Sequence, residues 1–313
     1  MKCLVTGASG FVGRELCRAL LARGDSIVAL SKSGATLPDG TATTALDLAC
    51  GLLPDEQLRG VEVVFHLAGI AHQRAADDAY EQLNYQATLR LARQAAAAGA
   101  RRFIFLSSVK AMGPAGGAGV RREGDITAPT DPYGSSKWRA ERSLQEEFAS
   151  GPMSVVILRP ALVYGPGAKG NLQLLARAVN AGLPRPPSAG GRSMIAVQDL
   201  AELLCSCADL PVKGVRTWIA ADGQAYTTRA ICDALRHISG RQPGVAWLPL
   251  WVWRLAAGVL DRVSPAAGES RYEKMFGQEL YSNEAVCAAT GWRPRYTLLE
   301  SLPQIVAGQG RSN

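Results

Sequence analysis

The chain has 313 residues, 47% hydrophobic and 19% charged, which excludes a disordered or collagen-like protein and suits one large globular unit or two lobes. Seven scattered cysteines without a C-x-x-C pair, and three histidines, indicate reduced thiols in a cytoplasmic protein rather than disulfides or a metal site. The formal charge of +7 comes from dispersed arginines, so we expect no nucleic-acid partner, although part of the excess could serve a phosphate-bearing ligand.

The first half of the chain alternates short β-rich runs with helical patterns. We expect strands at residues 2–6, 26–30, 61–67, 102–107 and 154–159. We expect helices at residues 10–23, 77–98 and 133–148. This alternation predicts an α/β fold, in which helices cover both faces of a doubly wound parallel sheet.

The texture changes after Tyr164-Gly165-Pro166-Gly167. Residues 183–191 are rich in proline and glycine and predict a loop, and shorter helices and strands follow. We expect a smaller C-terminal lobe there, laid over the carboxyl edge of the sheet, where open α/β sheets bind ligands. A strand at 217–220 is expected to return to the main sheet.

One apolar stretch, residues 248–260, is interrupted by Arg254 and is too short to span a bilayer. It predicts an amphipathic or partner-facing helix, with peripheral membrane contact as the alternative. We expect no transmembrane segment elsewhere in the chain.

A glycine-rich motif follows the first predicted strand and opens the first helix: Gly7-Ala8-Ser9-Gly10-Phe11-Val12-Gly13. Glycines permit a tight turn and a close approach of the backbone to a pyrophosphate. The helix amino terminus supplies free N–H groups and the positive end of a dipole. The motif therefore predicts dinucleotide binding, and a simple tight turn is the alternative.

Two further motifs carry candidate catalytic groups. Tyr133 and Lys137 share one helix face, where an ammonium can stabilise a phenolate and lower the pKa of the phenol. Ser108 follows a predicted strand and can donate a hydrogen bond to a substrate oxygen. Taken separately, a surface pair and a capping hydroxyl would explain them equally well.

Together these motifs resemble the extended short-chain dehydrogenase/reductase superfamily, in particular its nucleotide-sugar epimerase, reductase and dehydratase branch. The resemblance covers nearly the whole chain. It extends to His66-Leu67-Ala68-Gly69, Asn84, Leu158-Arg159-Pro160, Val163-Tyr164-Gly165-Pro166-Gly167 and Gly291-Trp292-Arg293-Pro294.

The resemblance implies a Rossmann-type dinucleotide-binding domain at residues 1–165 and a mainly substrate-binding lobe at 166–313. Tyr133 would transfer the proton, Lys137 would lower its pKa and bind ribose, and Ser108 would hold the reacting oxygen. The residues implied to bind the cofactor are Gly7, Ser9, Gly10, Phe11, Val12, Gly13, Asp47, Leu48, Ala68, Gly69, Tyr133, Lys137 and Pro160. A turn aspartate is the alternative for Asp47.

On the substrate side, Asn171 and Arg192 resemble family residues that hold a nucleotide diphosphate. Arg271 stands where a second such arginine is expected, with a surface salt bridge as the alternative. Lys110, like Ser108, is a candidate substrate contact, facing the sugar or the diphosphate, or else solvent.

Two departures concern the sugar. Leu162 and Met112 stand where the family often has a sugar-contacting asparagine and a tyrosine.

The implied activity is oxidoreduction at C4 of a nucleotide sugar, chiefly a UDP-hexose or UDP-N-acetylhexosamine 4-epimerase for surface-polysaccharide precursors. The alternatives are an NADPH-dependent reductase of 4-keto-6-deoxy-UDP-sugars and a non-catalytic dinucleotide sensor. Dehydration across C5–C6 is not expected, because Val109 and Lys110 replace the Asp-Glu pair of the resembling dehydratases. A homodimer is expected.

The cofactor is NAD or NADP, with NADP favoured. Enzymes selective for NAD usually place an acid on the adenosine ribose at the end of the second strand. Here Ser31-Lys32-Ser33 follows instead, and hydroxyls and an ammonium can bind a 2′-phosphate. A plain polar loop is the alternative for Ser31 and Lys32, and Asp39 folding back to the ribose would restore NAD preference.

Overall fold

The computed structural model describes residues 1–71, 77–115, 117, 119–168, 171–263 and 270–307. Its largest element is a seven-stranded sheet in the order β11-β7-β5-β4-β1-β2-β3, with every neighbouring pair parallel. The strands are β1 (Lys2–Thr6), β2 (Ser26–Ser31), β3 (Thr44–Ala45), β4 (Val63–His66), β5 (Arg102–Leu106), β7 (Ser154–Pro160) and β11 (Val215–Ala220). The predicted α/β, doubly wound fold is confirmed.

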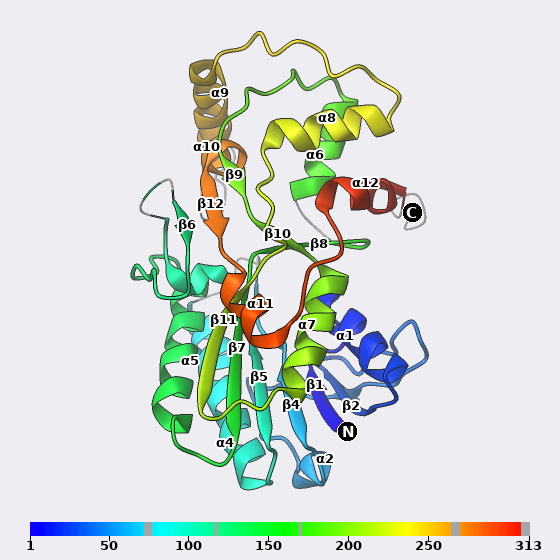
Figure 1. The fold of residues 1–313 in the computed structure, drawn as a ribbon, viewed down its shortest axis with the longest axis vertical. Coiled ribbons are helices and arrows are strands. Elements are labelled where there is room, and N and C mark those ends of the chain that lie inside the picture. The colour runs from blue at the N-terminus through cyan, green and yellow to red at the C-terminus, as the bar shows by residue number, and fades with distance from the viewer. Residues whose placement is uncertain (72–76, 116, 118, 169–170, 264–269, 308–313) are drawn as a thin grey trace.

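Helices cover both faces of this sheet (Figure 1). Successive strand residues point to opposite faces, so Val5 and Ile104 pack into one core while Leu4 and Phe103 pack into the other. The first core includes α1 (Phe11–Ala22) and α7 (Val197–Asp209). The second includes α4 (Ala87–Ala97) and α5 (Pro132–Phe148). Burial on both faces explains why the strands are nearly continuous apolar runs.

The helix expected at 77–98 differs from the prediction. It consists of α3 (Asp77–Tyr80), a π-helical turn (Glu81–Gln86) and α4. Asn84, in the wide turn, is fully buried, and its side chain bonds the backbone of Ile70 in both directions, at 2.8 and 3.0 Å. The short β3 and α2 (Asp55–Leu58) were not expected from the sequence.

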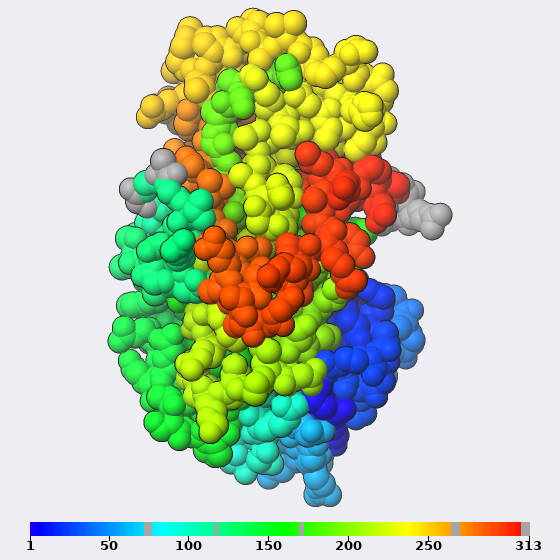
Figure 2. Space-filling view, viewed as in Figure 1, coloured from blue at the N-terminus to red at the C-terminus, as the bar shows by residue number. Residues whose placement is uncertain are grey.

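A second lobe stands on the carboxyl edge of the sheet (Figures 1 and 2). Three short parallel strands form one sheet, β6 (Val120–Arg121), β12 (Gln278–Tyr281) and β9 (Gly191–Arg192), and β8 (Leu162–Tyr164) pairs with β10 (Met194–Ala196). The helices of this half are α6 (Asn171–Asn180), α8 (Thr228–Ile238), α9 (Leu250–Val263), α10 (Arg271–Phe276), α11 (Glu284–Thr290) and α12 (Leu298–Ala307).

The second lobe has its own core. Tyr164 and Ile231 belong to it, together with residues of α6 and α12, such as Val179 and Leu302. Within the described ranges, no helix combines the length and apolar character needed to cross a membrane.

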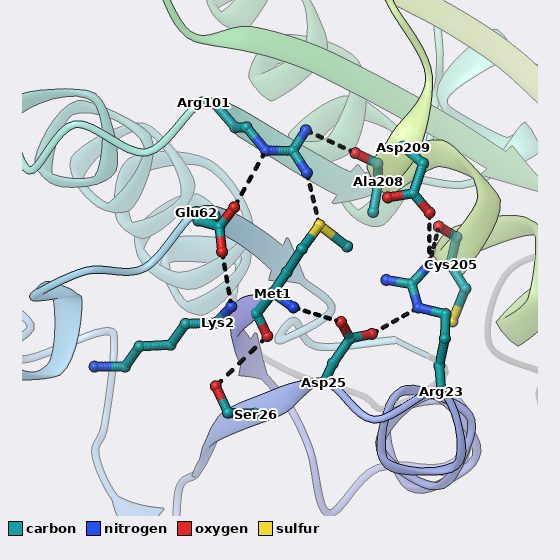
Figure 3. Close-up of polar contacts among 10 residues, drawn as sticks. All are labelled: Met1, Lys2, Arg23, Asp25, Ser26, Glu62, Arg101, Cys205, Ala208 and Asp209. Atoms are coloured by element: carbon teal, nitrogen blue, oxygen red, sulfur yellow. Dashed lines mark hydrogen bonds and ion pairs between the residues drawn. The ribbon is translucent and has the colours of Figure 1, made fainter.

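At the amino edge of the main sheet, ion pairs join segments that are distant in sequence (Figure 3). The amine of Met1 lies 2.8 Å from Asp25, and Arg23 bonds Asp25 at 2.6 Å and Asp209 at 2.7 Å. Arg101 donates to the sulfur of Met1 at 2.6 Å. These contacts tie β1, β2 and α7 together at the edge opposite the second lobe.

Candidate active site

The glycine motif forms a tight loop between β1 and α1. Gly7 adopts φ +69°, and a Cβ atom there would lie 2.8 Å from the backbone nitrogen of Ala68. A Cβ at Gly13 would overlap the carbonyl oxygen of Gly7, so α1 packs directly on the loop.

The first turn of α1 leaves donors available for an anion. Gly10 caps the helix without a side-chain hydrogen bond, and the turn that begins with Phe11 and Val12 carries no acid. Its backbone N–H groups and the positive dipole end lie beside a cradle that only glycines permit. These features fit the pyrophosphate of a dinucleotide, with Ser9 in the same loop.

The loop after β4 approaches the same place. Gly69 packs so closely that a Cβ atom would lie 2.9 Å from the side-chain oxygen of Asn84 and 3.3 Å from the ammonium nitrogen of Lys137. The backbone nitrogen of Ala68 donates to the hydroxyl of Thr6 at 3.2 Å. Ala68 and Gly69 therefore lie between the glycine loop and the helix that carries Lys137.

His66, at the end of β4, is buried and has a structural part here. Its two ring nitrogens are each 2.8 Å from a hydroxyl, those of Thr6 and Thr88. Burial, reinforced by the charge of Lys137, lowers the pKa of His66 to about 3. The ring is therefore neutral near pH 7 and does not serve as a proton shuttle there.

Tyr133 stands in the first turn of α5, where the Asp131 side chain accepts a hydrogen bond from the Gly134 nitrogen at 2.9 Å. Burial raises the pKa of Tyr133 to about 12, while a hydrogen bond with Ser108 and the charge of Lys110 act to lower it. The ring of Tyr80 lies 6.3 Å from that of Tyr133, between centroids.

Ser108 caps the 3-10 turn Val109–Met112, accepting from the Lys110 nitrogen at 3.2 Å. The sequence interpretation as a capping hydroxyl and the interpretation as a site residue are thus compatible.

Lys137 lies one turn after Tyr133 and is buried. Its ammonium donates to the carbonyl oxygen of Leu106 at 3.0 Å and stands 4.5 Å from the ring centroid of Phe105. Burial lowers the pKa of Lys137 to about 8, although the charge of Glu141 raises it. A buried ammonium so close to losing its proton is typical of active sites rather than of surface pairs.

A buried ion pair, not anticipated from the sequence, supports this helix. Glu141, one turn beyond Lys137, pairs with Arg159 of β7 at 2.6 Å, and both side chains are 2% exposed. Ser107 donates to the same carboxylate at 2.5 Å. The helical spacing Tyr133, Lys137, Glu141 is visible in the sequence, but the partner on β7 is not. Pro160, next to Arg159, ends β7 beside the carboxyl end of β5.

The segment after β2 differs from the sequence interpretation of Ser31. This side chain is 4% exposed. Its hydroxyl bonds that of Thr43 at 2.7 Å and accepts from the nitrogens of Gly34 and Ala35 at 3.0 and 3.2 Å. The structure therefore assigns Ser31 to the turn, which corrects the prediction that its hydroxyl would bind a phosphate.

Lys32 is exposed and pairs with Asp47 at 2.9 Å. Leu48, next to Asp47, is buried, so the predicted adenine contacts lie near the end of β2. Asp39 bonds the nitrogen of Thr41 within its own loop, at 2.9 Å.

On the substrate side, two predicted cations converge on one carboxylate. Lys110 lies 3.1 Å from Glu279 of β12, and Arg192 of β9 lies 3.2 Å from its other oxygen. Glu279 had no signal in the sequence, because three segments distant in the chain build the cluster. Arg271 pairs with Asp261 of α9 at 2.6 Å, as a salt bridge within the lobe. Asn171 opens α6, but its side chain lies outside the described part of the structure, as does Gly170.

These groups make an arrangement suited to proton transfer next to a dinucleotide. A phenol bonded to a serine hydroxyl can hold and accept the proton of a substrate alcohol, and nearby ammonium groups stabilise the phenolate. The glycine loop stands on the neighbouring strand ends. The site residues that the structure brings together are Gly69, Ser108, Lys110, Tyr133 and Lys137.

Comparisons with known proteins agree with this geometry. A family model described as the NAD dependent epimerase/dehydratase family matches residues 3–217. A UDP-glucose 4-epimerase from Vibrio cholerae is 31% identical over 96% of this chain and 93% of its own. A dTDP-6-deoxy-L-talose 4-dehydrogenase (NAD(P)(+)) from Kitasatospora kifunensis is 27% identical over 97% of this chain and 94% of its own. The solved structure of MoeE5 in complex with UDP-glucose and NAD is similar with a TM-score of 0.79 and 27% identity, covering 100% of this chain and 99% of that one.

Proposed function

Because the chain belongs to the NAD-dependent epimerase/dehydratase family of extended short-chain dehydrogenases/reductases, we propose that it is a UDP-hexose or UDP-N-acetylhexosamine 4-epimerase. Membership makes it an NAD(P)-dependent enzyme with a nucleotide-sugar function. The observation that carries the proposal is the hydrogen-bonded pair Ser108 and Tyr133 beside the buried Lys137, at the strand ends next to the glycine loop. The proposed role is in the synthesis of surface-polysaccharide precursors.

In this mechanism the chain's own residues manage the proton of the sugar's 4-hydroxyl. Ser108 holds the oxygen, and Tyr133 accepts its proton when C4 is oxidised and returns it when C4 is reduced. A bound nicotinamide would supply the hydride acceptor and donor. The charges of Lys137 and Lys110 favour the phenolate, which opposes the effect of burial on the pKa of Tyr133.

The nucleotide diphosphate is proposed to bind near Glu279. Lys110 and Arg192 bring two positive charges to its single carboxylate, so the cluster keeps an excess charge for an anion. Asn171 and Arg271 complete the proposed set. In this division of labour, residues 1–165 hold the dinucleotide and 166–313 mainly the sugar nucleotide, in a homodimer.

Dehydration across C5–C6 is not part of the proposed activity. Val109 is buried in an apolar cluster and has no group that moves a proton. Lys110 is paired with Glu279, which favours its charged form and so opposes service as a base. No 4-keto-6-deoxy product should therefore form from an unmodified UDP-hexose.

A reductase of 4-keto-6-deoxy-UDP-sugars is the second candidate, favoured by the exposed ammonium of Lys32 at the end of β2. A net reductase consumes NADPH, and we propose that NADP(H) binds at least as well as NAD(H). With Ser31 committed to the turn, Lys32 is the proposed contact for a 2′-phosphate. Asp47, its partner, brings an acid near the same place, which opposes this preference.

Product analysis with a panel of UDP-sugars distinguishes the two activities. The protein is incubated with UDP-glucose, UDP-N-acetylglucosamine or a 4-keto-6-deoxy-UDP-sugar, and products are identified by NMR. An epimerase interconverts the first two with their C4 epimers without net consumption of cofactor. A reductase consumes one NADPH for each keto sugar. Absence of turnover with every member of the panel would contradict both candidates.

A further inference from the structure

The first half of α9 and the loop before it carry an exposed apolar surface. Trp251 is 65% exposed, Leu255 62% and Val263 80%, high values for side chains of this size. We call this surface the α9 strip. It consists of Val245, Trp247, Trp251, Leu255, Val259, Leu260 and Val263.

The strip is one continuous side of a helix. Trp251, Leu255, Val259 and Val263 follow one another at one-turn spacing, so their side chains form a single row. The other side of α9 is already used: Trp253 is buried, and its ring stands 5.8 Å from that of Phe276 in α10. Packing within the lobe therefore accounts for only one of the two apolar sides.

The strip lies at one end of the molecule. Figures 1 and 2 show α9 and the loop that precedes it at the outer end of the second lobe, far from the amino edge of the main sheet. A flat partner can reach this end without touching α1 or the glycine loop.

Positive charge accompanies the strip. Arg254 and Arg262 are exposed on α9, and Arg254 stands 5.8 Å from the ring centroid of Tyr272. The acid of this helix, Asp261, is paired with Arg271. Residues 229–276 contain seven arginines and lysines against four acids.

We infer that the α9 strip binds the surface of an anionic lipid bilayer. Leucine, valine and tryptophan side chains would enter the boundary between headgroups and acyl chains, and Arg254 and Arg262 would contact lipid phosphates. Two tryptophans, Trp247 and Trp251, are of the residue type that prefers this boundary. The 14 residues of α9 extend for about 21 Å, too short to cross a hydrocarbon core of about 30 Å, so the helix would lie along the surface.

Charge also argues against a second copy of this chain as the occupant. A two-fold contact through the strip would bring Arg254 and Arg262 of both copies together, while Asp261 is already paired. An anionic bilayer instead supplies the opposite charge across its whole surface. The inference does not depend on the proposed reaction.

Sedimentation of the full chain with vesicles tests the inference. We expect binding to vesicles of phosphatidylcholine with phosphatidylglycerol, weaker binding to phosphatidylcholine alone, and a decrease with added salt. The double variant Trp251→Ser, Leu255→Ser should lower the partition coefficient about tenfold or more. Leu52→Ser is the matched control, because Leu52 is equally exposed, at 65%, but lies in the other half of the chain.

The outcomes are separated by two further measurements. Circular dichroism of each variant checks that the fold is retained, and Arg254→Glu should reduce binding to the anionic vesicles alone. Equal sedimentation with and without vesicles would overturn the inference. So would concentration-dependent self-association that the double variant abolishes, since a second copy would then occupy the strip.

Discussion

The two edges of the main sheet use charge in opposite ways. At the amino edge, Asp25 would have its pKa raised by burial, but the Met1 amine and Arg23 hold it below its ordinary value. At the carboxyl edge, burial prevails: the pKa of Lys137 falls to about 8 and that of Tyr133 rises to about 12. The amino edge is arranged for stability, whereas the carboxyl edge holds groups away from their preferred protonation states, as catalysis requires.

The largest expected effect concerns the phenol at the carboxyl edge. Tyr133→Phe should lower turnover by about 10²–10⁴-fold, because it removes the proton-transferring group and little else. Cofactor binding, measured by fluorescence titration, should be nearly unchanged. Tyr85→Phe is the matched control, since that phenol bonds Ser143 at 3.2 Å on the same helix and should be dispensable. Near-normal turnover of Tyr133→Phe would remove Tyr133 from the mechanism.

Ion pairs at the two edges should differ in what they contribute to stability. Glu141→Gln leaves Arg159 charged and buried, and should lower the free energy of unfolding by about 3–5 kcal/mol. Asp209→Asn breaks a partly exposed pair with Arg23 and should cost at most about 1 kcal/mol. Chemical denaturation of both variants gives the comparison. Equal losses would mean that the two edges do not differ in this respect.

Lys137 should show the cost of holding a charge inside the protein. Its pKa falls from 10.5 to about 8 on folding, so the ammonium opposes folding below pH 8, and stability recovers as pH rises from about 8 towards 10.5. Lys137→Met should therefore abolish most turnover yet raise the free energy of unfolding at pH 7 by about 1–2 kcal/mol.

The pH dependence of stability checks the sign of this effect. Between pH 8 and 10, wild-type stability should gain on that of Lys137→Met, because only the wild type can release this proton. A variant that is less stable than the wild type at pH 7 would contradict the account of a destabilising buried ammonium.

The cofactor prediction carries the smallest effect. Lys32→Ala should weaken NADPH binding about tenfold and leave NADH binding nearly unchanged, because only the former has a 2′-phosphate. Lys2→Ala provides a control for loss of one surface lysine. If wild type prefers NADH tenfold or more, Asp47 rather than Lys32 governs this end of β2, and the reductase alternative weakens.

Much of the fold and half of the site follow from local patterns in the sequence. The strand–helix alternation, the glycine loop and the Tyr133–Lys137 spacing each depend on residues close together in the chain. The buried pair Glu141–Arg159 and the carboxylate of Glu279 depend on pairing between distant elements, which no local pattern specifies.

Ser31 was misassigned for a similar reason. Its partner Thr43 comes from the next turn of chain, and the β2–β3 pairing that brings them together was not expected. The π-helical turn around Asn84 was likewise hidden, since an alanine-rich pattern predicts an ordinary helix there.

The account depends most on hydride chemistry at C4, and an isotope label tests that directly. UDP-glucose or UDP-N-acetylglucosamine deuterated at C4 is incubated with the protein in ordinary water, and the C4 epimer is examined by NMR. We predict that the epimer keeps its deuterium, because Tyr133 exchanges only the hydroxyl proton and the carbon-bound hydrogen leaves and returns as hydride. Solvent hydrogen at C4 of the epimer, or no epimer from either sugar, would contradict the account.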